Sequence, residues 1–270
     1  AKKLGKLPKI VVPVHFSGQP CDMPAIHELS KHYGFKIIED ASHAIGSSYN
    51  QIKVGSCTHS DITVFSFHPV KIITTAEGGM ALTNDKDVAN KIYRLRTHGI
   101  TSDKIKMEER PKDEIWNYQQ IDLGFNYRMN DIQAALGLSQ MKRLDKYVKR
   151  RQEIAKHYDN TLKKLPLVIP WQSPSNYSSY HLYTILIKKN LTQKTQRQVY
   201  DELIEKNIGI NLHYIPVHRQ PYYENLGFKK NIFPQAENFH REVLSIPIHP
   251  SLKEEQQSYV IETLKGILTK

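Results

Sequence analysis

The feature that most constrains the fold is an alternation of strand-like and helix-like segments near the start of the chain. KIVVPVHF at 9–16 is apolar, rich in valine and of strand length, and a turn signal, Ser17-Gly18, follows it. Such continuous runs are typical of strands buried on both faces of a parallel sheet. MPAIHELSKHYG at 23–34 has helical spacing and stops at a glycine, and FKIIED at 35–40 is again strand-like. Strand, helix and strand in this length predict a βαβ unit and hence an α/β fold.

Later segments extend the pattern. Strands are predicted at 62–67 and 79–83, and a helix at 85–99 with Asp85 as its cap and Gly99 at its end. The stretch 100–125 is polar and irregular, which predicts a surface excursion.

The longest helical pattern, 130–165, is broken by Pro166 and is predicted to join two domains. A large domain is expected over 1–140, and a linking helix with a small C-terminal domain over 141–270. The second domain is expected to contain a strand, a helix, a second strand and a final helix, over 181–187, 195–207, 208–214 and 253–268.

The positive net charge raises the question whether the protein binds nucleic acid. The net charge is +11 and the pI about 9.4, but the lysines are spread along the chain. The densest run, 142–151, has helical spacing and is interpreted first as a solvated helix face. An anionic small molecule such as a nucleotide is also served by a positive field. Nucleic acid is therefore not the expected partner, and a basic nucleic-acid-binding protein is kept as the distant alternative.

Other classes are disfavoured by the sequence. No stretch has the roughly 20 apolar residues that span a bilayer, so no membrane partner is expected. Cys21 and Cys57 form no C-x-x-C and no metal spacing, so no metal site is predicted, and reduced thiols in a cytoplasmic protein are expected.

Three chemically active groups fall where strands end. Glu39-Asp40 closes one predicted strand, Ser66 is near the end of another, and Lys71 follows a short loop. Since ligands of open α/β sheets sit at the carboxyl ends of the strands, an amine, a carboxylate and a hydroxyl are expected at one edge. The alternatives are a solvated loop lysine, a strand-end cap and a small strand residue.

Pyridoxal 5'-phosphate (PLP) requires this set of groups. Its aldehyde requires an amine, which partial burial makes nucleophilic. Its pyridine nitrogen requires a carboxylate that keeps the ring protonated, and its phosphate requires hydroxyl and N–H donors.

Five motifs then narrow the class of enzyme. In chain order they are IIEDASHAIGSSY, SDITVFSFHPVKIITTAEGGMALTN, LRTHGI, IDLGFNYRMNDIQAALGLSQ and NLHYIPVHRQPYY. Together they resemble the DegT/DnrJ/EryC1/StrS family of sugar aminotransferases, over nearly the whole chain. The resemblance implies a fold-type I PLP-dependent transferase with a mostly parallel-sheet large domain and a smaller α/β C-terminal domain.

The resemblance also implies roles for single residues. Lys71 matches the Schiff-base lysine, and Asp40 the carboxylate on the pyridine nitrogen. His43 stands where the family faces the phenolic oxygen of the cofactor; the alternative is a packed core histidine. Ser66 matches a phosphate ligand. Asn126 matches an asparagine that reaches the phosphate of the neighbouring subunit, which implies a homodimer; the alternative is a turn residue.

On the substrate side, His213 and Tyr214 match a loop of the small domain that contacts the donor or the sugar. His15 and His98 are candidates for the lining of the site, with a structural role equally open. Relatives that dehydrate carry histidine at the position of Lys71, so this lysine favours amine transfer. The implied substrates are a UDP-linked 4-keto-6-deoxy-N-acetyl amino sugar and L-glutamate, which yields 2-oxoglutarate.

The resemblance does not extend to the N-terminal segment of the family. Family members carry a segment before residues 9–14 whose glycine-rich turn holds the cofactor phosphate at a helix N-terminus. Nothing in this sequence matches that segment, so the large domain is expected to be truncated and the activity of this chain alone is an open question. The alternatives are another nucleotide-sugar 4-aminotransferase or an inactive fragment.

Overall fold

A computed structural model describes residue 3 and residues 5–269 of the chain. These residues divide into two compact units. Unit 1 takes the described residues up to His15 and Pro20–Leu144, and unit 2 takes Phe16–Gln19 and the residues from Asp145 onward. Each unit has its own sheet and its own helices, and each is described below by itself.

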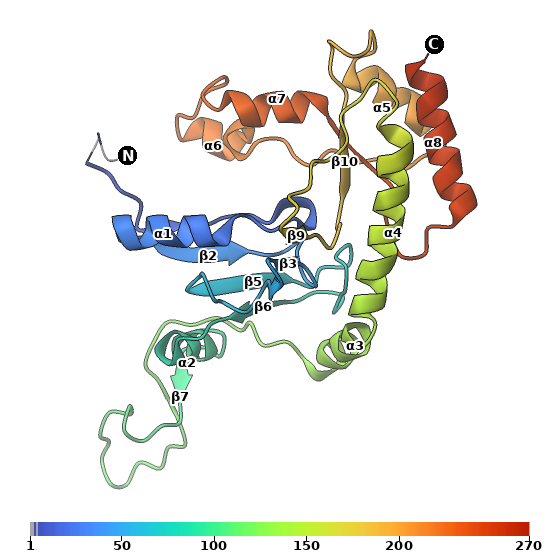
Figure 1. Ribbon diagram of the computed structural model, residues 1–270. Helices are drawn as coiled ribbons and strands as arrows, with labels where there is room; N and C mark the ends of the chain where they lie inside the picture. The colour runs from blue at the N-terminus through green and yellow to red at the C-terminus, as the bar shows by residue number, and fades with distance from the viewer. Residues whose placement is uncertain (1–2, 4, 270) are drawn as a thin grey trace. The chain divides into compact units, whose positions relative to one another are not determined.

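Unit 1 is built on a four-stranded sheet in the order β1-β2-β5-β6. β1, β2 and β5 are parallel, and β6 pairs antiparallel with β5. The predicted βαβ unit is confirmed, because α1 connects β1 to β2 and lies alongside β2 (Figure 1). Asp22 caps the start of α1, and Gly34, at φ 76°, ends it as predicted. The elements up to β6 are β1 Ile10–Val11, α1 Met23–Tyr33, β2 Lys36–Asp40, β3 Ser48–Tyr49, β4 Ile52–Lys53, β5 Ile62–Ser66 and β6 Gly79–Leu82.

The first strand is much shorter than the predicted 9–16. Only Ile10 and Val11 form regular ladder pairs, and Val14 adds an isolated bridge to Asp40. Pro13 lies between them and has no N–H to donate to a ladder, although its carbonyl accepts from the N–H of Asp40 at 2.9 Å.

The second half of unit 1 is helical and irregular. Asp85 caps α2 with bonds from two backbone N–H groups, as predicted, but the helix ends at Leu95 and not near Gly99. The stretch 100–125 is the expected surface excursion, with Ile105 94% exposed. The remaining elements are α2 Lys86–Leu95, β7 Ile100–Thr101, β8 Gln119–Gln120 and α3 Asp131–Met141.

The single helix predicted over 130–165 is wrong. α3 ends at Met141 and α4 starts at Leu144, and the division between the two units falls there. The periodic apolar residues of the two helices also differ. Ile132 of α3 is 84% exposed, whereas Ile154 of α4 is buried. The predicted periodicity was therefore continuous in sequence but belongs to two helices with different surroundings.

Unit 2 packs helices against the antiparallel pair β10–β11. α4 and α8 lie side by side (Figure 1), joined by a hydrogen bond from Gln257 Nε2 to the Ile154 carbonyl at 2.8 Å. The strand predicted at 208–214 forms only one bridge, Asn211 to Ser245. The elements are a 3-10 helix at Phe16–Gly18, α4 Leu144–Leu162, β9 Asn176–Tyr177, β10 Tyr183–Leu186, α5 Gln196–Glu205, a 3-10 helix at Val217–Arg219, α6 Pro221–Asn225, α7 Pro234–Glu242, β11 Val243–Ile246 and α8 Glu254–Leu268.

The basic run 142–151 is not a uniformly solvated face, contrary to the first interpretation. Arg151 and Val148 are 5% and 2% exposed, while Lys146 and Lys149 face solvent. Among the helices of the described residues, none combines the length and apolar character that crossing a membrane requires.

Candidate functional site

Lys71 lies in the loop 67–78 that joins β5 to β6, and Phe67 closes the base of this loop. The N–H of Phe67 donates to the carbonyl of Gly78 at 2.9 Å, and its own carbonyl accepts from the N–H of Thr75 at 3.0 Å. The loop is therefore tied to the end of β5 on both sides of the lysine.

The side chain of Lys71 is half-buried, and its chain neighbours Ile72 and Ile73 are buried at 5% and 2% exposure. Burial lowers the pKa of Lys71, and the Asp40 carboxylate raises it by less, so the net change is downward. A lysine that acts as a nucleophile or accepts a proton requires this direction, because only the neutral amine has a free electron pair.

Asp40 ends β2 and has one carboxylate oxygen held. Oδ1 accepts from the N–H of Ser42 at 3.0 Å, while Oδ2 accepts no hydrogen bond from the described residues. Asp40 and Lys71 interact electrostatically but form no ion pair within the described part of the chain.

Ser66 lies on the same side of the sheet as Asp40. Asp40 is paired with Val64 in the parallel ladder, and Ser66 follows Val64 by two residues, which returns its side chain to that side. Ser66 Oγ accepts one long hydrogen bond, from the N–H of His68 at 3.4 Å. This side is half-exposed, whereas the side chains that alternate with these residues are buried: Ile37, Glu39, Thr63 and Phe65.

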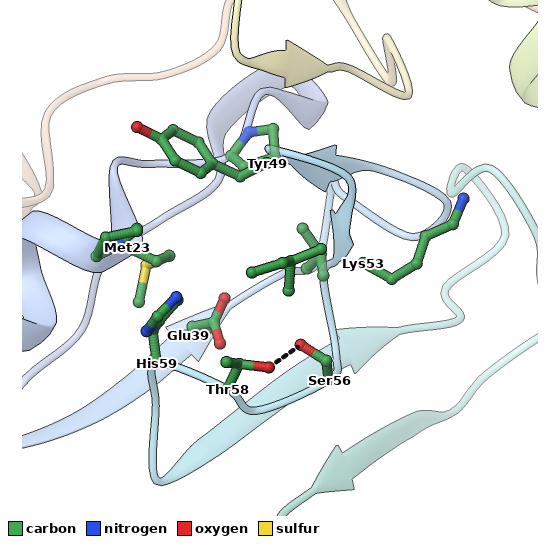
Figure 2. A pocket seen from close by; sticks show the side chains of 11 residues that line it. Met23, Glu39, Tyr49, Lys53, Ser56, Thr58 and His59 are labelled. Carbon is green, nitrogen blue, oxygen red and sulfur yellow. Dashed lines mark hydrogen bonds between the residues drawn. The ribbon is translucent and has the colours of Figure 1, made fainter.

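The hollows of unit 1 lie beside these groups and not around them. Figure 2 shows a small pocket in which the Glu39 carboxylate lies among Met23, Thr58 and His59. Its volume of about 30 Å³ is room for a water molecule and not for a cofactor. A larger groove of about 940 Å³ is lined by Val64, by residues of β6 and α2 and by residues 127–129, 133 and 134. Neither of these two is lined by Lys71, Asp40 or Ser66.

His43 and Asn126 occupy different surroundings. His43 is buried at 7% exposure in the turn that follows β2, three residues after Asp40. Asn126 is exposed, in a segment whose backbone pairs with Thr97 after α2. No side-chain contact joins Asn126 to Lys71 or Asp40 within the described residues.

His213 and Tyr214 belong to unit 2, where they form an aromatic cluster. Their rings meet edge to face at 4.7 Å, and Tyr214 meets Phe16 at 6.4 Å. His213 Nδ1 is hydrogen-bonded to Ser245 Oγ at 2.7 Å, which fixes the ring, and Tyr214 is 51% exposed. Phe16 was not singled out from the sequence, because no local pattern links it to a segment two hundred residues away.

The two further histidine candidates differ in burial. His15 is fully buried and bonded to Glu39, which the sequence marks only as the neighbour of Asp40. His98 is half-buried in a turn at φ 58°, and its backbone bonds to Phe125 and to the side chain of Gln120.

The groups at the ends of β2 and β5 fit PLP. Lys71 offers an amine with a lowered pKa, Asp40 a carboxylate oxygen that no described donor occupies, and Ser66 a hydroxyl with one long hydrogen bond. These are the donors and acceptors that the aldehyde, the pyridine nitrogen and the phosphate require. The assignment of these residues stays a prediction.

Comparison with known proteins points to one family. The model of the DegT/DnrJ/EryC1/StrS aminotransferase family matches residues 2–265. The spore coat polysaccharide biosynthesis protein SpsC of Bacillus subtilis is 38% identical over 263 residues, 96% of this chain and 67% of that protein. The UDP-4-amino-4,6-dideoxy-N-acetyl-beta-L-altrosamine transaminase of Campylobacter jejuni is 37% identical over 258 residues, 95% of this chain and 65% of that protein.

Solved structures agree. Helicobacter pylori PseC, an aminotransferase involved in the biosynthesis of pseudoaminic acid, superposes with a TM-score of 0.85 at 30% identity over 96% of this chain and 66% of that one. The sugar aminotransferase Spr1654 of Streptococcus pneumoniae in its PLP form gives 0.83 at 28% identity, over 96% and 68%, and a PMP form is also known. The predicted fold class is confirmed, and the chain spans about two thirds of the length of these relatives.

Proposed function

The chain belongs to the DegT/DnrJ/EryC1/StrS aminotransferase family, whose cofactor is PLP, and on this basis we propose that it transfers an amino group to a nucleotide-linked keto-sugar. The proposed acceptor is a UDP-linked 4-keto-6-deoxy-N-acetyl amino sugar, and the proposed donor is L-glutamate, which leaves as 2-oxoglutarate. The similarity to the Campylobacter transaminase and to PseC supports a place in pseudaminic acid biosynthesis. The observation that carries the proposal is the half-buried Lys71, whose pKa burial lowers, within electrostatic range of Asp40 at the end of β2.

Each residue of the sheet edge has a part in this reaction. PLP supplies an electron-accepting ring and an aldehyde carbon that carries nitrogen from donor to acceptor. Lys71 would hold that carbon through its amine and, when free, would take a proton from the α-carbon of glutamate in the donor half of the reaction and deliver a proton to C4 of the sugar in the acceptor half. Asp40 Oδ2 would hold the pyridine nitrogen in its protonated form, and Ser66 Oγ would donate to the phosphate.

The remaining candidates surround this centre in the proposal. His43 faces the phenolic oxygen of the cofactor, and Asn126 reaches the phosphate of a neighbouring subunit in a cytoplasmic homodimer. The exposure of Asn126, without a side-chain partner among the described residues, supports a contact outside its own chain. His213 and Tyr214 contact the glutamate carboxylate or the sugar. No nucleic acid or membrane takes part.

A first experiment tests the cofactor site alone. The chain is incubated with PLP, reduced with borohydride and digested, and the modified peptide is identified by mass spectrometry. PLP is expected on Lys71, and the label is expected to disappear in Lys71→Ala. Lys91→Ala is the control, since Lys91 is an exposed lysine of α2 in the same unit. An undiminished label in Lys71→Ala, or a label spread over surface lysines, contradicts the assignment.

A second experiment tests the reaction. The chain, and a chimera that adds the third of the Campylobacter relative that this chain does not cover, are given glutamate and the UDP-linked 4-keto sugar, and 2-oxoglutarate and the 4-amino sugar are measured. Equal amounts of both products support the proposal. Turnover of a different nucleotide-linked keto-sugar identifies another 4-aminotransferase, and labelling of Lys71 without turnover in either protein identifies an inactive fragment.

A further inference from the structure

Unit 1 buries a carboxylate that the proposed reaction does not use. Glu39 is 5% exposed and His15 is fully buried, and His15 Nε2 lies 2.7 Å from Glu39 Oε2. Oε1 of Glu39 accepts from Thr63 Oγ1 at 2.8 Å and also from Ser60 Oγ. Burying a charged group is costly unless its hydrogen bonds are satisfied, so these three donors are what allow the carboxylate to stay inside.

The protonation of His15 follows from its other nitrogen. Nδ1 accepts the backbone N–H of Cys21 at 3.1 Å, so it carries no proton, and the proton of the neutral ring is on Nε2, directed at Glu39. Burial raises the pKa of Glu39, but the hydrogen bonds from His15, Ser60 and Thr63 outweigh it and lower the pKa. Burial lowers the pKa of His15, but its hydrogen bonds to Cys21 and Glu39 raise it to about 9 overall. Because Nε2 carries a proton in the protonated ring and in this neutral tautomer alike, an N–H donor faces the ionised Glu39 carboxylate in both forms.

This pair encloses the backbone of Asp40. The N–H of His15 donates to the carbonyl of Asp40 at 3.0 Å, and Glu39 is the preceding residue on the same strand. On its other edge, Asp40 is in ladder with Val64, and the N–H of Ala41 donates to the Val64 carbonyl at 2.9 Å. His15 is thus bonded twice to the end of β2: its side chain to the side chain of Glu39, on the packed side of the sheet, and its backbone N–H to the carbonyl of Asp40.

We propose that His15 is a positioning residue for the cofactor site: through its bond to Glu39 it fixes the end of β2 and so the direction of the Asp40 carboxylate. The inference rests on the proposed function, because it assigns Asp40 to the cofactor. Asp40 and Glu39 point to opposite sides of the pleat, so a rotation of the backbone that carries Glu39 away from His15 also turns Asp40. Such supporting shells hold reacting groups in position at many sites.

Two substitutions test the hydrogen bond from His15 to Glu39 separately from the loss of the imidazole ring. His15→Gln keeps an N–H donor near the place of Nε2, whereas His15→Asn places its amide near Nδ1, out of reach of Glu39. Both leave a polar side chain of similar character in the same cavity. If the bond to Glu39 is what matters, Gln is expected to restore what Asn loses.

The first readout needs no cofactor. Amide hydrogen exchange of Asp40 and Ala41 is measured in the free chain, together with exchange of β10 in unit 2 as a reference. His15→Asn is expected to speed exchange at 40–41 by about tenfold or more while β10 is unchanged, and His15→Gln is expected to match the wild type. The second readout is bound PLP: about tenfold weaker binding and a shifted absorbance band in His15→Asn, both restored in His15→Gln.

The outcomes also separate this proposal from the proposed function. Unchanged exchange and an unchanged band in His15→Asn overturn the positioning role. The positioning role is also overturned if His15→Asn and His15→Gln lose protection at 40–41 and PLP binding equally, in proportion to a fall in the stability of the whole of unit 1. That result indicates a purely structural residue. If the wild type takes no PLP on Lys71, the proposed function fails, and the exchange of 40–41 alone then decides whether His15 positions Asp40.

Discussion

Gly99 offers a direct test of how unit 1 holds the segment that carries Asn126. Gly99 has φ 72°, and its backbone bonds to Arg94, Ile121 and Asp122. A Cβ added at Gly99 lies 1.9 Å from the Asp122 carbonyl oxygen, a distance at which the backbone must move. Gly34 provides the control, because it has φ 76° and its added Cβ meets nothing within 4 Å.

The two alanine substitutions share one cost and differ in the other. An L-residue in the left-handed region loses about 1–2 kcal/mol, partly offset by the roughly 0.4–1 kcal/mol that alanine gains through the unfolded chain. Gly34→Ala is therefore expected to lower the free energy of unfolding by about 1 kcal/mol or less. Gly99→Ala adds an overpacking cost of about 1–3 kcal/mol, because the colliding atom is backbone and cannot change rotamer.

The measurement is hydrogen exchange in increasing urea, read from peptides of β2 and β5, which reports the unfolding of unit 1 separately from unit 2. With a urea slope of about 1–3 kcal/mol per molar, the difference between the two variants is expected to move the midpoint by about 1 M. Equal midpoints for Gly99→Ala and Gly34→Ala refute the reasoning, since they show that the crossing of 99 and 122 relaxes without cost.

Two further perturbations follow from buried charges. Arg151→Met removes a guanidinium whose Nη1 donates to the carbonyls of Tyr180, His181 and Ile248 at 2.9–3.2 Å. Three charge-assisted bonds are lost at about 1.5–3 kcal/mol each, and the burial of the charge, which lowers the pKa of Arg151 to about 10, offsets about 3 kcal/mol of this. The expected loss in denaturant unfolding of unit 2 is about 1.5–6 kcal/mol, against no loss in the exposed Lys149→Met. The pKa of Glu39 is lowered below 4.5 in the folded state, so its contribution to the free energy of unfolding is present above pH 4.5 and is lost as the pH falls through the folded pKa. Glu39→Gln is expected to be less stable at pH 7 and to lose less stability than the wild type when unfolding is measured from pH 7 to 3. An equal loss of stability with pH in both proteins contradicts this.

Local signals in the sequence predicted the elements that local chemistry decides. Asp85 and Gly34 bound helices as caps, and each acts through atoms within a few residues. Where the outcome depends on distant partners, the sequence was insufficient. The helix predicted over 130–165 is divided because its halves belong to different units, and the residues at 142–143 include no glycine or proline that predicts a break there.

The same limit applies to the sites. Lys71, Asp40 and Ser66 were predicted to meet because the carboxyl ends of parallel strands share an edge, and the structure places Asp40 and Ser66 on one side with Lys71 within electrostatic range. Phe16 beside Tyr214 and Arg151 inside unit 2 were not predictable, since a lone aromatic and a basic residue in a charged run have no local pattern that marks them as buried. Their environment is set by contacts far away in sequence.

The two adjacent carboxylates of β2 show why register, and not residue type, assigns a role. Glu39 and Asp40 are chemically alike and consecutive, yet the pleat sends them to opposite sides of the sheet. On one side Glu39 meets Thr63 of β5 and the donor of His15, so it is buried and fully bonded. On the other side Asp40 stands level with Val64, a partner without a donor side chain, so one of its oxygens stays available. A shift of β2 by one residue would exchange these positions, so that Glu39 would lie on the half-exposed side and lose its bonds to His15 and Thr63. The bonds of Glu39 therefore act against that shift, and they keep Asp40 on the half-exposed side of the sheet together with Ser66.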